Sequence, residues 1–407
     1  MEEPRSVELH RSVVAALLRP TATENVPLAR ARGRVLAADV VAAVSLPSFD
    51  NSAMDGYAVR AAELAGASEA SPVELRVAAD IPAGRTDVPV LEPGTVHRIM
   101  TGALLPSGAD AVVQVENSDG GVDRVRISAQ PEVGAFLRHA GEDVTAGDVV
   151  LTAGTILQAP QIGVAAAVGS ATVPVRRRPV VLVLSTGSEL VAPGTPLQPG
   201  QIYESNGPML AAAVEEAGGV AELLRFVPDD VDEFLGVLRD RVERGMTDLV
   251  LTSGGVSAGA YEVVKDAFTG RGVDFVKVAM QPGGPQGAGV VADLGGVAVV
   301  TLPGNPVSSQ VSFEVFVRPA LRAAMGHPHP DRPAVTATLG ERVTSPAGRR
   351  QFRRGALDAV RGSVREVGSA ASHMLGSLAL AECLFVVPED VTELDAGAPV
   401  EVWLLDG

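Results

Sequence analysis

The sequence predicts a multidomain α/β protein, in which a central doubly wound α/β domain lies between a β-rich N-terminal module and a C-terminal β-barrel. The chain has 407 residues, of which 46% are hydrophobic, and at about 150 residues per domain this length predicts about two to four domains. Aromatic residues make up only 3%, whereas Gly (44) and Pro (29) are plentiful, as is typical of small-residue α/β layers and turn-rich β modules. Strand-like and helix-like segments also alternate regularly between Pro179 and Leu321.

The N-terminal segment begins with a short amphipathic helix. Apolar residues recur near helical spacing from Val7 to Leu18, and Pro20 prevents the helix from continuing. Strand-then-helix patterning returns over residues 148–172. We therefore expect one discontinuous domain, formed by residues 1–46 and 144–177.

An inserted β-rich module is predicted for residues 47–143. Short β-like runs such as Val73 to Ala78 and Ala111 to Glu116 are separated here by Pro-Ala-Gly, Glu-Pro-Gly and Pro-Ser-Gly turns.

Residues 178–326 have the pattern of the central α/β domain. Continuous apolar strands separated by amphipathic helices predict a parallel sheet that is covered on both faces. The strands are expected at 179–185, near Leu223, at 248–253, 273–280 and 296–302, and the helices at 208–217, 230–242, 260–269 and 306–321.

The last domain is predicted for residues 327–407. The proline-rich segment His327 to Pro333 is typical of a linker. The runs 334–339, 383–388 and 399–405 that follow are alternating or β-branched and are separated by turns, which favours a small β-barrel or sandwich.

Charge and cysteine content exclude several classes of function. The formal net charge is −16, with 33 basic against 49 acidic residues and no dense Lys/Arg cluster, so we expect no nucleic-acid partner. Cys383 is the single cysteine and excludes an internal disulfide and a cysteine-based metal site. No secretory signal and no run of about 18 apolar residues is present, so we expect a cytoplasmic protein without membrane insertion.

Three loops rich in small and polar residues each follow a predicted strand of the α/β domain. They span Ser185 to Glu189, Ser253 to Gly259 and Pro303 to Ser308. Ligands of doubly wound sheets bind at the carboxyl ends of the strands, and Gly and Ser residues let backbone N–H groups and hydroxyls approach an anion. The loops therefore predict a phosphate-bearing ligand, although ordinary tight turns would have the same composition. The candidate binding residues are Ser185, Thr186, Gly187, Ser253, Gly254, Gly255, Ser257, Pro303, Gly304 and Asn305.

Four carboxylates lie near these loops and are candidate Mg²⁺ ligands: Glu189, Asp229, Asp230 and Glu262. Hard oxygen ligands of this kind hold Mg²⁺ against phosphate. For at least one of Asp229 and Asp230, N-terminal capping of the next helix is the favoured role.

Polar residues are also concentrated in the β-rich module. The stretch Ser48 to Arg60 contains more hydrogen-bonding side chains than a connector needs, and nearby segments add others. These residues are Asp50, Asn51, Ser52, Asp55, Tyr57, Thr101, Arg138, Glu142 and Asp143. Simple turn formation by the aspartates and a surface ion pair between Arg138 and Glu142 are the alternatives.

Taken in order, the motifs resemble those of the molybdopterin molybdenumtransferase family, which includes the bacterial MoeA proteins and the C-terminal domain of gephyrin. The resemblance runs nearly end to end. It rests on SFDNSAMDGYAVR, IMTGA, AGED, STGSEL, GQIYESN, SGGVS, LPGNPVS, the FRRG of 352–355 and the Ser372-His373 pair.

The resemblance implies a homodimer of elongated four-domain subunits, with the α/β domain of one chain facing the N-terminal β module of the other. The implied reaction uses adenylylated molybdopterin, molybdate and Mg²⁺ to insert molybdenum into the dithiolene and release AMP. The implied catalytic residues are Asp55, Thr101, Arg138, Asp143, Glu189 and Asp230, and the implied metal ligands are Glu189, Asp230 and Glu262.

The chain departs from the family at the molybdate pocket. Gln281-Pro282-Gly283-Gly284-Pro285 stands where a KPGKP segment is common, so both lysine positions are lost and weaker oxyanion binding is expected. Pro285, Ser308, Arg354 and Ser372 match other positions of the pocket. Glu262 replaces a typical aspartate, and Ala288 stands where an aromatic residue is common.

These departures support a second hypothesis, a gephyrin-like scaffold with weak or no transferase activity. MQPGGPQG resembles an actinobacterial branch tied to cell division, in which glutamine commonly replaces the first lysine. Its partners would be cell-division proteins or a molybdopterin adenylyltransferase. The N- and C-terminal modules argue against a third possibility, a single-domain molybdopterin-binding or adenylylating protein. Molybdenum insertion is the leading hypothesis.

Overall fold

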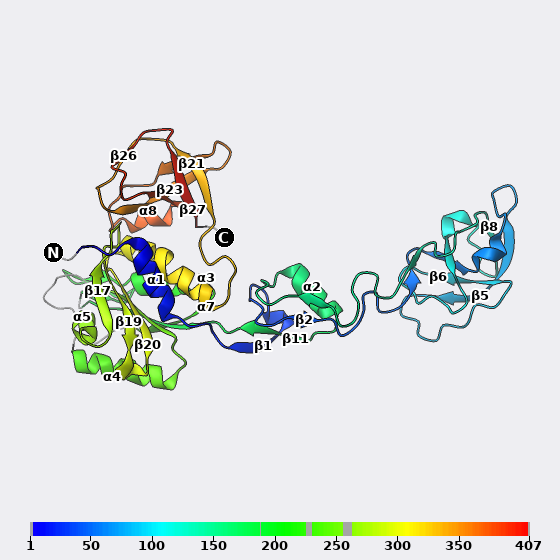
Figure 1. The fold of residues 1–407 in the computed structure, drawn as a ribbon, viewed down its shortest axis with the longest axis horizontal. Helices are drawn as coiled ribbons and strands as arrows, with labels where there is room; N and C mark the ends of the chain where they lie inside the picture. Colours follow the sequence, from blue (N-terminus) through cyan, green and yellow to red (C-terminus); the bar gives the residue numbers. More distant parts are fainter. Residues whose placement is uncertain (1–2, 188, 225–229, 255–262, 406–407) are drawn as a thin grey trace. The chain divides into compact units, whose positions relative to one another are not determined.

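The computed structural model describes residues 3–187, 189–224, 230–254 and 263–405. The chain forms two compact units, one of residues 1–24 and 175–407 and one of residues 25–174 (Figure 1). The first unit contains the α/β domain and the C-terminal barrel, and the second contains the β-rich module.

The α/β domain is built on a six-stranded sheet with the order β15-β12-β16-β20-β19-β17. Its strands are β12 (Val180–Ser185), β15 (Val220–Leu224), β16 (Leu249–Ser253), β17 (Val273–Lys277), β19 (Pro285–Val291) and β20 (Val297–Leu302). The first four strands in the sheet order are parallel, as predicted.

The prediction of a wholly parallel sheet is wrong at one edge. Strand β19 is antiparallel to both β20 and β17. A parallel crossover needs about a dozen or more connecting residues, whereas β17 and β19 are joined by the short segment 278–284. The chain therefore turns back and forms a hairpin.

Both faces of the sheet are covered, as predicted. Side chains alternate along β12, so that Val181 and Val183 enter one core while Leu182 and Leu184 enter the other. The first core is closed by α1 (Val7–Leu17), α3 (Asn206–Glu216), α6 (Pro306–Ser312), the π-helical turn η5 (Phe313–Val317) and α7 (Arg318–Ala324), and the second by α4 (Val231–Arg244) and α5 (Val263–Phe268).

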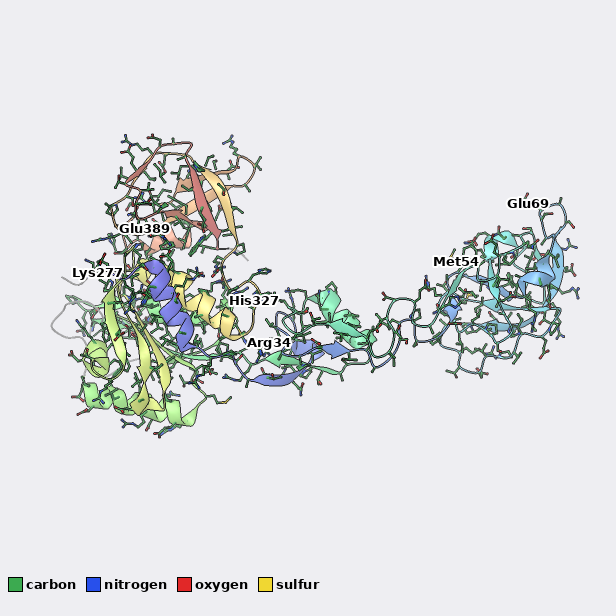
Figure 2. All side chains as sticks on the ribbon, in the orientation of Figure 1. Arg34, Met54, Glu69, Lys277, His327 and Glu389 are labelled. Carbon is green, nitrogen blue, oxygen red and sulfur yellow. The ribbon has the colours of Figure 1, made fainter. Side chains whose placement is uncertain are left out.

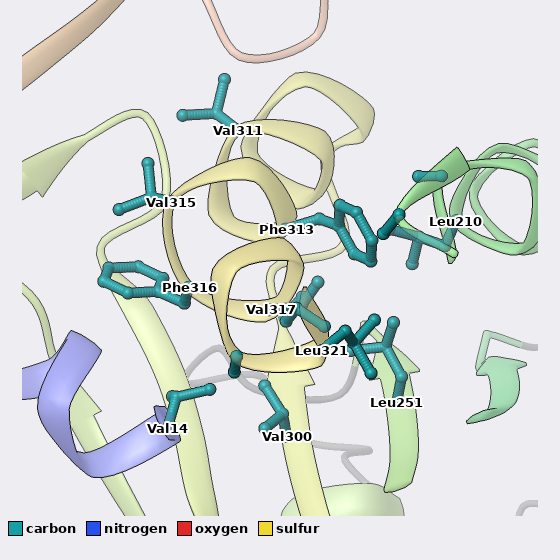
Figure 3. Packing of buried hydrophobic residues seen from close by; sticks show 14 of the residues in the cluster. Val14, Leu210, Leu251, Val300, Val311, Phe313, Val315, Phe316, Val317 and Leu321 are labelled. Carbon is teal, nitrogen blue, oxygen red and sulfur yellow. The ribbon is translucent and has the colours of Figure 1, made fainter. Parts of the chain in front are cut away.

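Phe313 and Phe316 anchor the first core from the turn between α6 and α7 (Figure 3). Phe313 points toward Leu210 of α3, and the ring of Phe316 packs edge-to-face against His10 of α1, with ring centroids 4.8 Å apart. The helix predicted at the N-terminus is thus confirmed and packs on the α/β layers. Ser6 caps it by accepting a hydrogen bond from the Leu9 N–H at 3.2 Å.

The C-terminal strands close into a barrel, which settles the choice between barrel and sandwich. The order β23-β24-β21-β27-β25 is completed by pairing of β25 with β23. Cys383 is buried in β25, and burial raises the pKa of its thiol to about 11. The strands are β21 (Ala334–Leu339), β23 (Arg350–Asp358), β24 (Ser363–Glu366), β25 (Cys383–Val387) and β27 (Pro399–Leu404).

A short strand of the α/β domain extends the barrel sheet. Strand β18 (Met280–Gln281) lies in the segment that joins β17 to β19 and pairs in parallel with β23. Met280 lies opposite Arg350, and Gln281 lies opposite Gln351.

The second unit is β-rich, as predicted. Its main sheet has the order β7-β4-β6-β5-β8. The run predicted at 73–78 is the start of β5, and the run predicted at 111–116 contains all of β7 and the first residues of the 3-10 turn that follows it. The strands are β4 (Gly56–Val59), β5 (Val73–Ile81), β6 (Thr95–Ile99), β7 (Ala111–Gln114) and β8 (Arg124–Ile127).

Shorter elements complete this unit. Strand β2 (Val40–Val41) pairs with β10 (Val149–Leu151), and β3 (Asn51–Ser52) pairs with β9 (Leu137–Arg138). Helix α2 (Ala159–Ala167) follows β10. None of the helices in the described ranges of either unit combines the length and apolar character needed to cross a bilayer.

Candidate active site

The carboxyl ends of β12, β16 and β20 open into a cleft of about 1440 Å³, which also has a wall from the barrel. Residues of all three predicted loops line it, together with part of the predicted molybdate pocket. The predicted residues found there are Thr186, Gly187, Glu189, Ser253, Gly254, Pro285, Pro303, Gly304, Asn305, Ser308 and Ser372. Gly255, Ser257, Asp229 and Glu262 lie outside the described residues.

Hydrogen bonds and a close backbone contact hold the loops together. Asn206 donates from Nδ2 to Ser253 Oγ and to the Gly304 carbonyl, both at 2.7 Å. Gly254 has φ +94°, and a Cβ there would lie 2.9 Å from the Thr186 carbonyl oxygen, so only glycine allows these two loops to approach. The described residues of the three loops therefore form a rim of backbone and hydroxyl groups.

Ser185 ends β12 at this rim. Its hydroxyl is buried and has no hydrogen-bond partner among the described residues.

Of the predicted acidic metal ligands that the structure describes, Glu189 lies in the cleft and Asp230 caps a helix. Glu189 lines the cleft, and its carboxylate oxygens would lie 2.6 and 2.8 Å from a Cβ at Gly187, so the side chain lies across that glycine. Asp230 accepts from the Asp232 and Glu233 N–H groups, both at 3.0 Å. The capping role left open for Asp230 is therefore confirmed.

Arg354 is placed differently from its expected position facing the molybdate pocket. It is buried, and its guanidinium donates to the carbonyls of Val367, Ser369 and Ala371. Burial lowers the pKa of Arg354. A buried guanidinium needs several acceptors, and here they come from the loop that brings Ser372 to the cleft.

Ser372 is fixed from the α/β side as well. Asn305 donates from Nδ2 to its hydroxyl at 2.9 Å, and the Val307 N–H donates to its carbonyl at 3.2 Å. The barrel wall is thereby joined to the loop that follows β20.

Two cations that the sequence analysis did not single out line the cleft, namely Lys277 (Figure 2) and Arg349. Both are exposed, and neither forms an ion pair or side-chain hydrogen bond within the described ranges. Lys277 is one of only two lysines in the chain, and Arg349 begins the run RRQFRR. The scarcity of lysine and the clustering of arginines around Arg349 are the sequence features that could have identified these two residues.

In the second unit, the structure brings Asp55 and Thr101 together. The Thr101 N–H and hydroxyl donate to Asp55 Oδ1 at 2.6 and 2.7 Å. Arg138 lies on β9 opposite Asn51. Asp143 is exposed, and its N–H donates to the Leu46 carbonyl at 2.9 Å.

The contacts of Asp50 and Glu142 differ from the alternatives weighed for this unit. Asp50 Oδ1 accepts from the Ala140 N–H at 2.8 Å, and because these residues lie 90 positions apart in the chain, this is a long-range contact and not a local turn. The ion pair expected between Arg138 and Glu142 is not formed in the described part of the chain; Glu142 instead accepts from the His139 N–H at 3.2 Å.

Comparison with known proteins places this arrangement in a family. Three family models match in sequence order: the MoeA N-terminal region (domains I and II) over residues 5–169, a probable molybdopterin binding domain over 182–323, and the MoeA C-terminal region (domain IV) over 336–405. The chain belongs to the MoeA family of molybdopterin molybdenumtransferases.

Individual family members resemble the chain over its whole length. It is 56% identical to molybdopterin molybdenumtransferase 2 of Mycobacterium tuberculosis H37Rv, over 98% of this chain and 99% of the relative. The Bacillus subtilis molybdopterin molybdenumtransferase is 34% identical over 94% and 90%. A crystal structure of the Pyrococcus horikoshii MoeA protein covers 100% of both chains, with 33% identity and a TM-score of 0.83.

The Asp55–Thr101 pair of this MoeA-family protein gives a testable pKa effect. The backbone N–H of Thr101, followed by its hydroxyl, holds the pKa of Asp55 below its ordinary value. Thr101→Val removes the hydroxyl and keeps the N–H, so the pKa of Asp55 is expected to rise but to stay below the ordinary value. A ¹³C NMR titration of the Asp55 carboxyl measures this shift.

Thr101→Ser is the matched control and should leave the pKa of Asp55 unchanged. The depressed pKa stabilises the folded state at pH above the unfolded-state pKa, and this contribution is lost as the pH falls through the folded-state pKa. Thr101→Val should therefore reduce that pH dependence. An unchanged Asp55 titration in Thr101→Val would contradict the role given to the hydroxyl.

Proposed function

We propose that this protein inserts molybdenum from molybdate into adenylylated molybdopterin and releases AMP. The observation that carries the proposal is the cleft. It is lined by residues of the three loops at the strand ends and by the cations Lys277 and Arg349, which have no ion-pair partner within the described ranges. Such a cleft suits a ligand with phosphates at one end and a second oxyanion at the other.

The loops after β12, β16 and β20 would bind the phosphates of the pterin and nucleotide through backbone N–H and hydroxyl groups. Molybdate would bind near Gln281, Ser308 and Ser372, with positive charge from Lys277 and Arg349. Helix α4 keeps its N-terminal cap from Asp230, and Arg354 holds the loop that carries Ser372.

Mg²⁺ is the proposed cofactor. In the described ranges no group of three or more His, Cys, Asp or Glu residues could hold a metal alone. Mg²⁺ commonly binds through one or two carboxylates together with substrate phosphates, and Glu189 is the carboxylate that lies across the phosphate-binding rim. When bound, the ion would neutralise charge on the phosphate anhydride.

A homodimer that acts in the cytoplasm is also part of the proposal, as is the participation of Asp55, Thr101, Arg138 and Asp143 in the reaction. Family membership is what supports these features of the proposal. The comparisons do not favour the scaffold hypothesis, since the full-length relatives are named as transferases.

The test is AMP release from adenylylated molybdopterin by the purified protein with Mg²⁺, over micromolar to millimolar molybdate. We expect release that depends on molybdate and saturates with it. Release that is absent, or that does not respond to molybdate, from a folded protein would overturn the proposal.

A further inference from the structure

A chain of side-chain hydrogen bonds runs from the barrel to Gln281 in the cleft. Because β18 and β23 are parallel and place Gln281 opposite Gln351, the two side chains lie next to each other. Gln351 donates from Nε2 to Gln281 Oε1 at 3.1 Å. Gln281 lines the cleft, whereas Gln351 is buried.

Arg353 continues this chain of hydrogen bonds. It lies two residues after Gln351 on β23, and side chains two apart on a strand point to the same face. Its Nε donates to Gln351 Oε1 at 2.7 Å, and its Nη1 donates to Glu366 Oε2 at 2.9 Å. Its Nη2 donates to the Thr344 carbonyl. Arg353 is itself buried and is held from three sides.

The arginine sets the direction of every bond in the chain. A guanidinium can only donate, so the Gln351 atom facing it must be the amide oxygen. The Gln351 amide nitrogen then faces Gln281 and requires an oxygen there. The other polar group of the Gln281 side chain is its NH₂. This NH₂ has no hydrogen-bond partner among the described residues, and Gln281 lines the cleft.

The backbone next to Gln281 is held as well. Gln286 is buried and donates from Nε2 to the Gly283 carbonyl at 2.8 Å and to Ser312 Oγ at 3.0 Å. Gly283 has φ +112°, and a Cβ there would lie 2.6 Å from Ser312 Oγ. The turn and the Gln281 side chain are therefore both preorganised.

We propose that the Gln281 NH₂ is the neutral hydrogen-bond donor to the tetrahedral oxyanion, and that Gln351 and Arg353 are positioning residues that aim it. The inference rests on the proposed function and names molybdate as the oxyanion. A prealigned amide donates to the anion without reorganisation on binding. The Gln281 amide thus supplies a hydrogen bond to the oxyanion, and Lys277 and Arg349 supply the positive charge.

The test compares Gln281→Met, Gln351→Met and the double variant in AMP release and in equilibrium dialysis with molybdate. Losing a hydrogen bond to an anion should raise the molybdate KM and Kd of Gln281→Met about tenfold. Gln351→Met should raise them about threefold or more. The KM for adenylylated molybdopterin should stay within about twofold for both variants. Since Gln351 acts only through Gln281, the double variant should match Gln281→Met.

Gln351→Glu is a second variant of nearly the same size. Its carboxylate keeps the bond from Arg353 but can only accept from Gln281, so the Gln281 amide turns its oxygen toward the cleft. We expect a larger rise in molybdate KM than in Gln351→Met. Gln161→Met, in helix α2 of the other unit, is the matched control and should leave the molybdate KM unchanged.

An unchanged molybdate KM and Kd in Gln281→Met would overturn the inference, as would additive effects in the double variant. The proposed function fails separately, if the wild-type protein shows no molybdate-dependent AMP release. In that event the dialysis experiment still decides the inference, because wild-type molybdate binding that is weakened by Gln281→Met supports it and the absence of such binding overturns it.

Discussion

Replacing both Lys277 and Arg349 with methionine is expected to raise the KM for molybdate by about 100-fold. Each side chain can give a charge-assisted hydrogen bond worth about 1.5 kcal/mol or more, which is about tenfold in affinity. Both residues flank the Gln281 segment. Lys277 ends β17 just before it, and Arg349 precedes Arg350, which pairs with Met280. Steady-state AMP release at varied molybdate measures the effect.

Arg361→Met is the matched control for this double variant, because it removes an exposed arginine that does not line the cleft. Its molybdate KM should remain within about twofold of wild type. A wild-type molybdate KM in the Lys277→Met/Arg349→Met variant would contradict the assignment of the oxyanion subsite.

Glu314→Ala is expected to lower the free energy of unfolding by about 3–5 kcal/mol, the usual cost of breaking a buried ion pair by removing one partner. Glu314 Oε2 accepts from Arg332 Nε at 2.8 Å, and Arg318 Nε lies 3.8 Å from the same oxygen. The Glu314 and Arg332 side chains are each only 3% exposed. Arg332 also donates to the Leu405 carbonyl at 2.5 Å, so the loss should loosen the barrel from the α/β domain. Urea unfolding monitored by circular dichroism gives the change.

Glu216→Ala provides a control on the same arginine. Glu216 Oε1 accepts from Arg332 Nη2 at 2.6 Å, but its side chain is 55% exposed. An exposed pair contributes about 1 kcal/mol or less. Equal destabilisation by the two variants would show that burial does not determine the strength of these pairs.

The layers of the α/β domain could be predicted because its strands and helices carry strong local patterns. The direction of the edge strands could not be predicted in that way. The run at 273–280 has the pattern of a strand whether its neighbour is parallel or antiparallel. The deciding feature is the short connection 278–284, which has room for β18 but for no crossover helix.

The rim of loops at the candidate site could be predicted because each of these loops directly follows a strand. The positions of side chains that bond to residues outside the cleft could not be predicted in this way. Asp230 occupies an ordinary capping position, and burial turns Arg354 toward carbonyls. The contact between Gln281 and Gln351 depends on the register of two strands far apart in the sequence. This register cannot be predicted from the local sequence of either strand.

Mass spectrometry of the pterin product tests molybdenum insertion most directly. The protein is incubated with adenylylated molybdopterin, Mg²⁺ and molybdate, and the released pterin and nucleotide are quantified together. We expect AMP and a pterin carrying one molybdenum atom to form in equal amounts. AMP formed together with molybdenum-free pterin would show simple hydrolysis and would contradict molybdenum insertion.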